Sequence, residues 1–109
     1  MSLDIWLNKP AVAEVEVFEA NITHNLAKMA EEANIYDALW RPEENEITHA
    51  WQLIGPLREA LEEMRDDPNR FKKHDADNGW GTYKDFLPWL ERLLEACVEH
   101  PGAIIRTSR

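Results

Sequence analysis

The segment from Leu3 to Ala20, LDIWLNKPAVAEVEVFEA, decides the fold class. Apolar and polar positions alternate in both halves of it: Leu3, Ile5 and Leu7 with Asp4 and Trp6, then, after a turn at Asn8-Lys9-Pro10, Val15 and Val17 with Glu14 and Glu16. A period of two is typical of strands that have one face against a core and the other in water. The segment therefore predicts two strands, at residues 3–7 and 13–20.

Helical patterns follow the two predicted strands. Thr23 is a candidate N-cap for a helix whose apolar set continues to Ala33, and Asn34 is a plausible left-handed stop. A short helical turn over residues 35–40 ends at Arg41-Pro42, because the residue before a proline is driven out of the helical region.

Two longer helices are predicted in the second half of the chain. Thr48 is a candidate N-cap for the first, with an apolar stripe at Ala50, Trp51, Ile54, Leu57, Leu61 and Met64. We expect Gly55-Pro56 to kink this helix. Thr82 and Asp85 form a capping-box variant at the start of the second, which carries its own stripe at Phe86, Leu90, Leu93, Leu94 and Cys97 and ends at His100-Pro101-Gly102.

The order of these elements predicts an α+β fold. Residues 103–109 read as a short final strand, so strands occupy both ends of the chain and helices lie between them. We expect a small antiparallel sheet from the two chain ends, packed against three to four helices, in a single domain over residues 1–109. A helical bundle with extended termini is the alternative.

Composition narrows the function classes. The 109 residues carry a formal net charge of −9, and residues 1–50 hold ten acids against three bases. A field of that sign disfavours nucleic acid. The single cysteine, Cys97, excludes an internal disulfide, and no segment matches a membrane helix or a secretory signal. We expect a cytoplasmic protein with no nucleic-acid or membrane partner.

Common catalytic and metal-binding signatures are poorly matched. Gly79-Trp80-Gly81 lacks the third glycine of a dinucleotide fingerprint, and the sequence from Asp75 lacks the glutamate that closes a calcium loop. Cys97 and His100 have no further zinc ligands at suitable spacing. Paired acids such as Glu62-Glu63 are interpreted as solvated charges. We therefore expect no cofactor and no metal site, and an enzyme ranks third among the function classes, behind the two binding hypotheses.

Two surfaces remain as binding hypotheses, each weighed against a purely structural role. Three segments combine rings with hydrogen-bonding groups, and if they converge they could bind a nucleotide-like anion through His24, Asn25, Trp40, Arg41, Trp80 and Tyr83. Acidic side chains could instead dock on a partner protein with a basic surface, through Glu14, Glu16, Glu19, Glu43, Glu44 and Glu46. The N-terminal strands could also pair across a homodimer if they form a sheet edge.

The same segments carry a resemblance. The sequences NITHN from Asn21, LWRPEE from Leu39 and NGWGTY from Asn78 resemble those of a family of small, uncharacterised acidic proteins of bacteria and their phages. The resemblance implies a phage or prophage accessory protein. We expect a non-catalytic binding module that binds a host protein through an acidic surface, with small-ligand binding or sequestration as the alternative.

Overall fold

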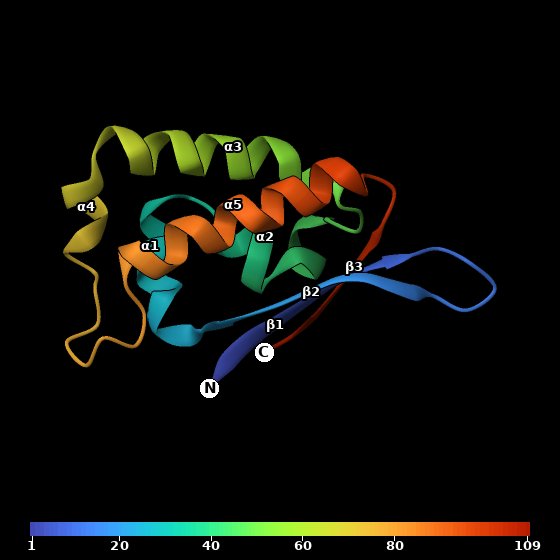
Figure 1. The fold of residues 1–109 in the computed structure, drawn as a ribbon, viewed down its shortest axis with the longest axis horizontal. Helices are drawn as coiled ribbons and strands as arrows, with labels where there is room; N and C mark the ends of the chain where they lie inside the picture. The colour runs from blue at the N-terminus through green and yellow to red at the C-terminus, as the bar shows by residue number, and fades with distance from the viewer.

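The sheet joins the two ends of the chain. The computed structural model describes residues 1–109, and its central strand β1 (Ser2–Lys9) lies between β2 (Val15–Thr23) and β3 (Ile104–Ser108). Both pairings are antiparallel, and the two termini lie near each other at one end of the sheet (Figure 1). The predicted α+β class is confirmed.

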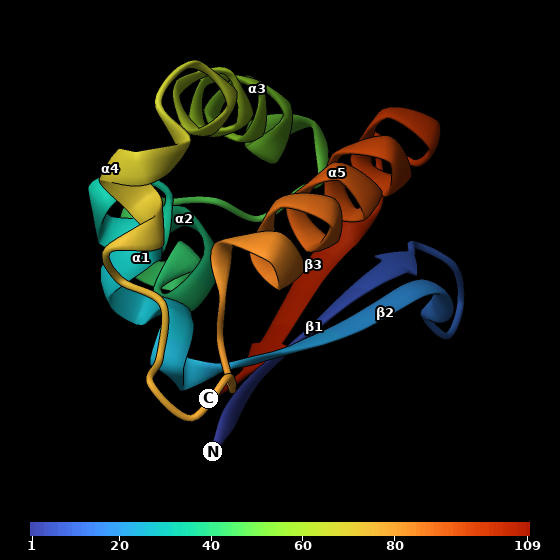
Figure 2. The ribbon, with the colours of Figure 1, turned by 60° about the vertical axis from the view of Figure 1, so that its left-hand side comes forward.

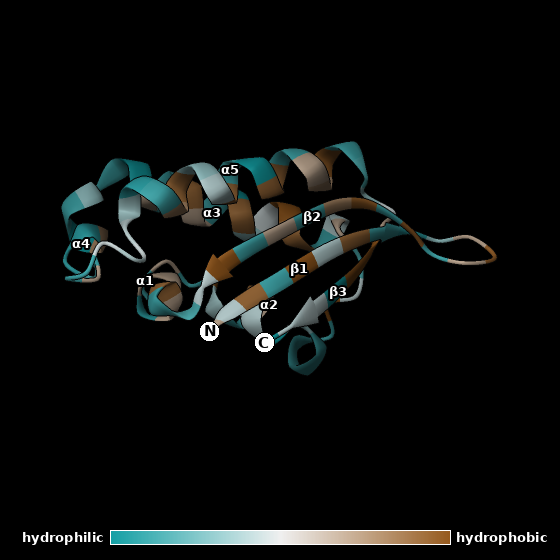
Figure 3. Cartoon of the chain, turned by 60° about the horizontal axis from the view of Figure 1, so that its bottom comes forward, coloured by the Kyte–Doolittle hydropathy of each residue, from teal (hydrophilic) through white to brown (hydrophobic).

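The helices cover one face of this sheet. The long helices α3 (Trp51–Asp66) and α5 (Tyr83–Glu99) pack against each other, and α5 lies over the sheet (Figure 2). The short elements fill the space beside them: η1 (His24–Leu26), α1 (Ala27–Glu32), α2 (Tyr36–Trp40), η2 (Pro42–Asn45) and α4 (Pro68–Lys72). Figure 3 shows the opposite face of the sheet without a helix over it.

One core lies between the layers. The inward side chains of β1, Leu3, Ile5 and Leu7, are fully buried, as the alternation predicts. The α5 stripe meets them with Phe86, Leu90, Leu93 and Cys97, all of which are also fully buried. Removing this apolar surface from water is the main stabilising term of such a fold.

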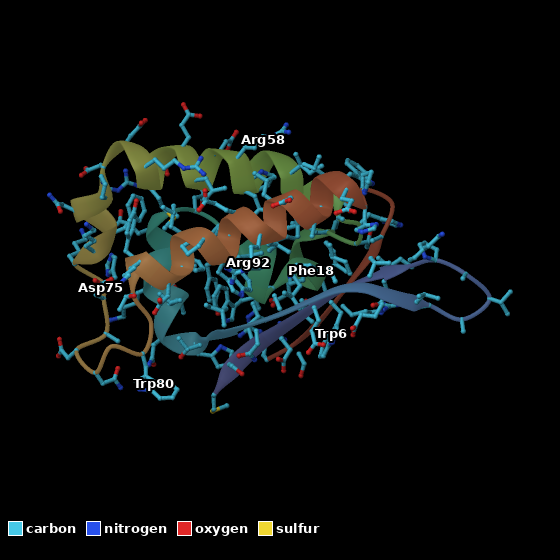
Figure 4. All side chains as sticks on the ribbon, viewed as in Figure 1. Trp6, Phe18, Arg58, Asp75, Trp80 and Arg92 are labelled. Atoms are coloured by element: carbon cyan, nitrogen blue, oxygen red, sulfur yellow. The ribbon has the colours of Figure 1, made fainter.

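β2 differs from the prediction because it contains a bulge. Leu7 pairs with Phe18 but Asn8 pairs with Glu16, so Val17 is an extra residue on β2. The bulge changes which residues face the helices. Phe18, partly buried against the core, points toward the helices, whereas Trp6 of β1 points to the uncovered side (Figure 4). Val15, expected on the core face, is exposed.

The start of α3 also corrects the sequence reading. The N-cap is Ala50, which makes no side-chain cap bond. Thr48 lies in an extended segment that accepts a hydrogen bond from Ile105 N–H, and the adjacent His49 pairs with Ile104. The capping role passes to Gln52, whose Oε1 accepts bonds from the backbone N–H groups of Thr48 and His49.

Other details of α3 follow from this start. Trp51, predicted in the buried stripe, is 59% exposed, and Leu53 and Ala60 occupy the core positions instead. Pro56 lies inside an uninterrupted helix, where it removes one intrahelical hydrogen bond.

No helix of the chain has the length and apolar character needed to cross a bilayer.

Three other predicted boundaries are confirmed, whereas the turn predicted at Asn8-Lys9-Pro10 is wrong, because β1 continues to Lys9 and β2 begins only at Val15. The Thr23 hydroxyl accepts a hydrogen bond from Asn25 N–H, and that of Thr82 accepts one from Asp85 N–H. Asn34 adopts the left-handed conformation with φ 56°. These caps matter for function because Thr23 and Thr82 lie within two of the three segments proposed to form a ligand site.

Candidate functional site

The first two ring-bearing segments meet through Trp40. Its indole Nε1–H donates a 2.9 Å hydrogen bond to Nδ1 of His24, and its ring stacks on Tyr36 at a centroid distance of 5.4 Å. Because Trp40 is only 2% exposed, its ring belongs to the core and cannot stack on a ligand. The bond also occupies one nitrogen of His24.

The third segment packs against the first. Asn25 Nδ2 donates a 2.8 Å hydrogen bond to the carbonyl of Trp80. Gly81 next to it has φ 113°, and a Cβ at this position would lie 3.0 Å from the Cβ of Asn25. Only glycine fits this approach. The structure therefore brings the three segments together, but it does so through contacts that stabilise the fold.

The remaining two predicted ligand residues are also engaged. Tyr83 is 9% exposed and its hydroxyl donates to the carbonyl of Met64 at 2.8 Å. Arg41 is half-exposed and pairs with Glu44 at 3.3 Å. Hydrogen bonding to Tyr36 and the charge of Glu44 raise the pKa of Arg41. Among the six residues, Trp80 alone presents most of its side chain to solvent, with 73% exposed (Figure 4).

A small depression lies beside the Trp80 ring. This Trp80 hollow has a volume of about 260 Å3 and is lined by Ile22, Thr23, Leu26, Asn78, Gly79, Trp80, Gly81 and Asp85. Its lining contains no lysine, arginine or histidine. On the other side of Trp80, a second depression is lined by Asn25 and Asn78 together with the N-terminal residues Met1 and Ser2.

Three of the six glutamates of the predicted protein-binding surface are paired with arginines. Glu14 binds Arg106 through both carboxylate oxygens, at 3.1 and 2.7 Å, and this bond is the main cause that lowers the pKa of Glu14. Glu43 binds Arg109 at 2.6 Å, which likewise lowers the pKa of Glu43. Glu44 binds Arg41. The other three, Glu16, Glu19 and Glu46, are exposed and make no ion pair.

The structure adds an acidic surface that the sequence reading missed. A depression of about 530 Å3 lies between α3 and the segment that runs from the end of α1 to residue 47. We call it the acidic groove because five exposed acids and no basic residue line it: Asp37, Glu59, Glu62, Glu63 and Asp66. Glu63 has an ion pair, at 3.6 Å from Arg70, and the other four have none.

The spacing of the acids in the sequence already indicates one wall of this groove. Positions 59, 62, 63 and 66 follow the helical repeat, so they lie on one face of α3, beside its buried stripe. Glu62 and Glu63 are exposed, as the sequence predicts, but the sequence does not predict the groove that they line, because Asp37 lies on α2 and enters it only through the tertiary fold.

The carboxylate of Glu32 contacts three basic side chains. Glu32 at the end of α1 accepts bonds from Arg70 and His74 and contacts Lys73 at 3.3 Å. The hydrogen bonds from His74 and Arg70 are the main causes that lower the pKa of Glu32 to about 2. This network ties α1 to α4, and Arg70 also pairs with Glu63 of the acidic groove. Burial raises the pKa of the Cys97 thiol to about 12.

The structure contains no cluster of three potential metal ligands. Comparisons with family models, with curated proteins and with solved structures find no match. The resemblance to phage and bacterial proteins stays a prediction.

Proposed function

We propose that the chain is a cytoplasmic, non-catalytic binding module that docks its acidic groove onto a basic surface of a partner protein. The observation that carries the proposal is the charge of the groove: five carboxylates line it and no basic side chain does. If the resemblance to phage accessory proteins holds, the partner is a protein of the bacterial host.

The arrangement of charge within the chain supports this reading. Glu14, Glu43 and Glu44 are each balanced by an arginine, whereas Glu59, Glu62 and Asp66 are unpaired. Like charges three or four residues apart lower the stability of a helix. A basic partner would relieve that repulsion, and the field of the groove would accelerate the encounter.

The alternative, a site for a nucleotide-like anion, receives less support. Trp40 and Tyr83 are buried and hydrogen-bonded within the fold, so the predicted stacking rings are reduced to Trp80. The hollow beside Trp80 carries Asp85 and no cation, which opposes binding of an anion.

The proposal is tested by titrating the 15N-labelled protein with a hexa-lysine peptide. We expect backbone amide shifts over residues 33–38 and 59–66 that weaken as salt is raised from 50 to 300 mM, because exposed charges are screened. The triple variant Glu59→Gln/Glu62→Gln/Asp66→Asn should bind the peptide more weakly than wild type.

A matched control variant distinguishes the effect of the groove on peptide binding from the effect of net charge. Glu16→Gln/Glu19→Gln/Glu46→Gln also removes three unpaired charges but leaves the groove intact. We expect it to keep most of the binding. Equal losses in the two triple variants would mean that net charge, and not the groove, attracts the peptide. That result would contradict the proposal.

A further inference from the structure

Trp80 is held rigidly while its ring stays in solvent. Its backbone N–H donates to Asn78 Oδ1 at 2.9 Å, and its carbonyl accepts the bond from Asn25. On either side, Gly79 and Gly81 have φ values of 77° and 113°. The loop thus fixes the backbone of Trp80, although its side chain is 73% exposed and contributes little burial to the fold.

An exposed ring on a fixed backbone favours binding of a partner at Trp80. An exposed tryptophan on an ordered loop loses little conformational freedom when a partner covers it. Tryptophan is also enriched among the residues that dominate binding energy at protein interfaces. The remaining question is the chemistry of what covers it.

The residues that line the Trp80 hollow indicate the chemistry of the group that binds there. The partly buried Ile22 gives it an apolar part beside the Trp80 ring, and the exposed Asp85 adds a carboxylate. No cation of this chain lines the hollow. A group that fits therefore needs an alkyl stem and a positively charged end that can lie on an indole.

We propose that the Trp80 hollow receives an arginine side chain from an extended basic segment of a partner protein. The guanidinium stacks on the Trp80 ring and pairs with Asp85, and its methylene stem covers Ile22. Arginine fits better than lysine because its planar head stacks on aromatic faces and binds a carboxylate through two donors. The inference shares with the proposed function the premise of a basic partner, but it uses a separate surface.

The test is an NMR titration with a hexa-arginine peptide, compared with hexa-lysine. The indole N–H signal of Trp80 reports on the hollow. That of Trp51, also exposed but located at the start of α3, is the internal reference. We expect the Trp80 indole and the amides of residues 78–85 to shift with hexa-arginine, to shift less with hexa-lysine, and the Trp51 indole to stay unchanged.

Two variants make the test specific. Trp80→Leu and Asp85→Asn should each weaken hexa-arginine binding, read at the amides of residues 78–85, by about twofold to fivefold, which corresponds to one exposed cation–π contact or one exposed ion pair. Both should keep the wild-type melting temperature within a few degrees, because both side chains are exposed and the Asp85 N–H bond to Thr82 is retained. In Asp85→Asn the amide oxygen can still accept the bond that the Thr82 hydroxyl donates to the Asp85 carboxylate.

The outcomes distinguish this inference from the proposed function. Shifts confined to residues 33–38 and 59–66, with none at Trp80, would overturn the inference and leave the acidic groove supported. Equal responses of Trp80 to the two peptides, or unchanged affinity in Asp85→Asn, would also overturn it. Shifts at Trp80 without shifts in the groove would support the inference and contradict the proposed function.

Discussion

At the scale of single residues, the bond between Trp40 and His24 should contribute measurably to stability. Because Nδ1 of His24 accepts this bond, the proton of the neutral imidazole sits on Nε2. His24→Ala leaves the buried indole N–H without its partner, which should cost about 1–3 kcal/mol in the free energy of unfolding measured with urea. In a Trp40→Phe background the same change should cost less. Equal costs in both backgrounds would show that the bond contributes nothing.

The glycines provide a second prediction at this scale. Gly81→Ala forces a side chain into a left-handed conformation and against Asn25, so it should destabilise the protein by more than about 1 kcal/mol. Gly102→Ala is the matched control. Gly102 has no positive φ and nothing within 4 Å of the added Cβ, so the change should stabilise by about 0.4–1 kcal/mol. Thermal unfolding of both variants checks the opposite signs.

These residues also show how far the sequence could be read. The caps at Thr23 and Thr82 and the left-handed Asn34 were predictable because each depends on neighbours within a few residues. The burial of Trp40 was not, because a ring at the end of a short helix packs or projects according to what the rest of the chain brings near it. Here that partner is His24, sixteen residues away.

At the scale of elements, α1 and α4 are joined mainly through Glu32. The pKa of Glu32 is lowered from 4.5 to about 2, so its network stabilises the fold above pH 4.5, and this contribution is lost as the pH falls toward 2. Glu32→Gln should therefore be less stable than wild type at pH 7, and the difference should shrink as the pH falls from 4.5 to 2. Urea unfolding at several pH values measures this.

The neighbouring glutamate is the control for that series. Glu31 is exposed and makes no ion pair, so Glu31→Gln should unfold like wild type. A difference between wild type and Glu32→Gln that stays constant between pH 7 and pH 2 would contradict the assignment, because it would then not depend on the ionised carboxylate.

The acidic face of α3 should lower the stability of its own helix. Glu59, Glu62 and Asp66 are spaced by three and four residues, and each like-charge pair costs about 0.2–0.5 kcal/mol. Glu59→Gln/Glu62→Gln/Asp66→Asn should therefore raise the melting temperature at low salt, and the gain should fade in 1 M NaCl as screening removes the repulsion. A triple variant less stable than wild type would show that these acids serve the fold and not a partner.

The strands and the start of α3 also show where local sequence patterns stop predicting the structure. The alternation in residues 3–7 placed β1 correctly because a strand buried on one face repeats every two residues. It failed in β2, where the bulge at Val17 breaks the period of two, so that Phe18 packs on the core and Val15 is exposed. The N-cap prediction failed at Thr48, because the pairing of residues 48–50 with the start of β3 depends on a segment more than fifty residues away.

At the scale of the whole molecule, the sheet made from both chain ends couples the unfolding of the two halves. β1 precedes all the helices in the sequence and β3 follows them, and side chains of both strands share one core cluster with α5. Cys97 reports on that opening. It is fully buried in the single core cluster, and its thiol pKa of about 12 leaves almost no reactive thiolate near pH 8.

We therefore expect the Cys97 thiol to react with a disulfide reagent only through global unfolding. The free energy of opening derived from the labelling rate should equal the free energy of unfolding measured with urea. Val98→Cys supplies the control, because position 98 is 49% exposed: this variant should show one fast and one slow thiol. Fast labelling of Cys97 in the wild type under native conditions would mean that α5 detaches from the sheet on its own. The Trp80 loop, which leads into α5 and packs on residues 23–26, would then be held less rigidly than its hydrogen bonds indicate.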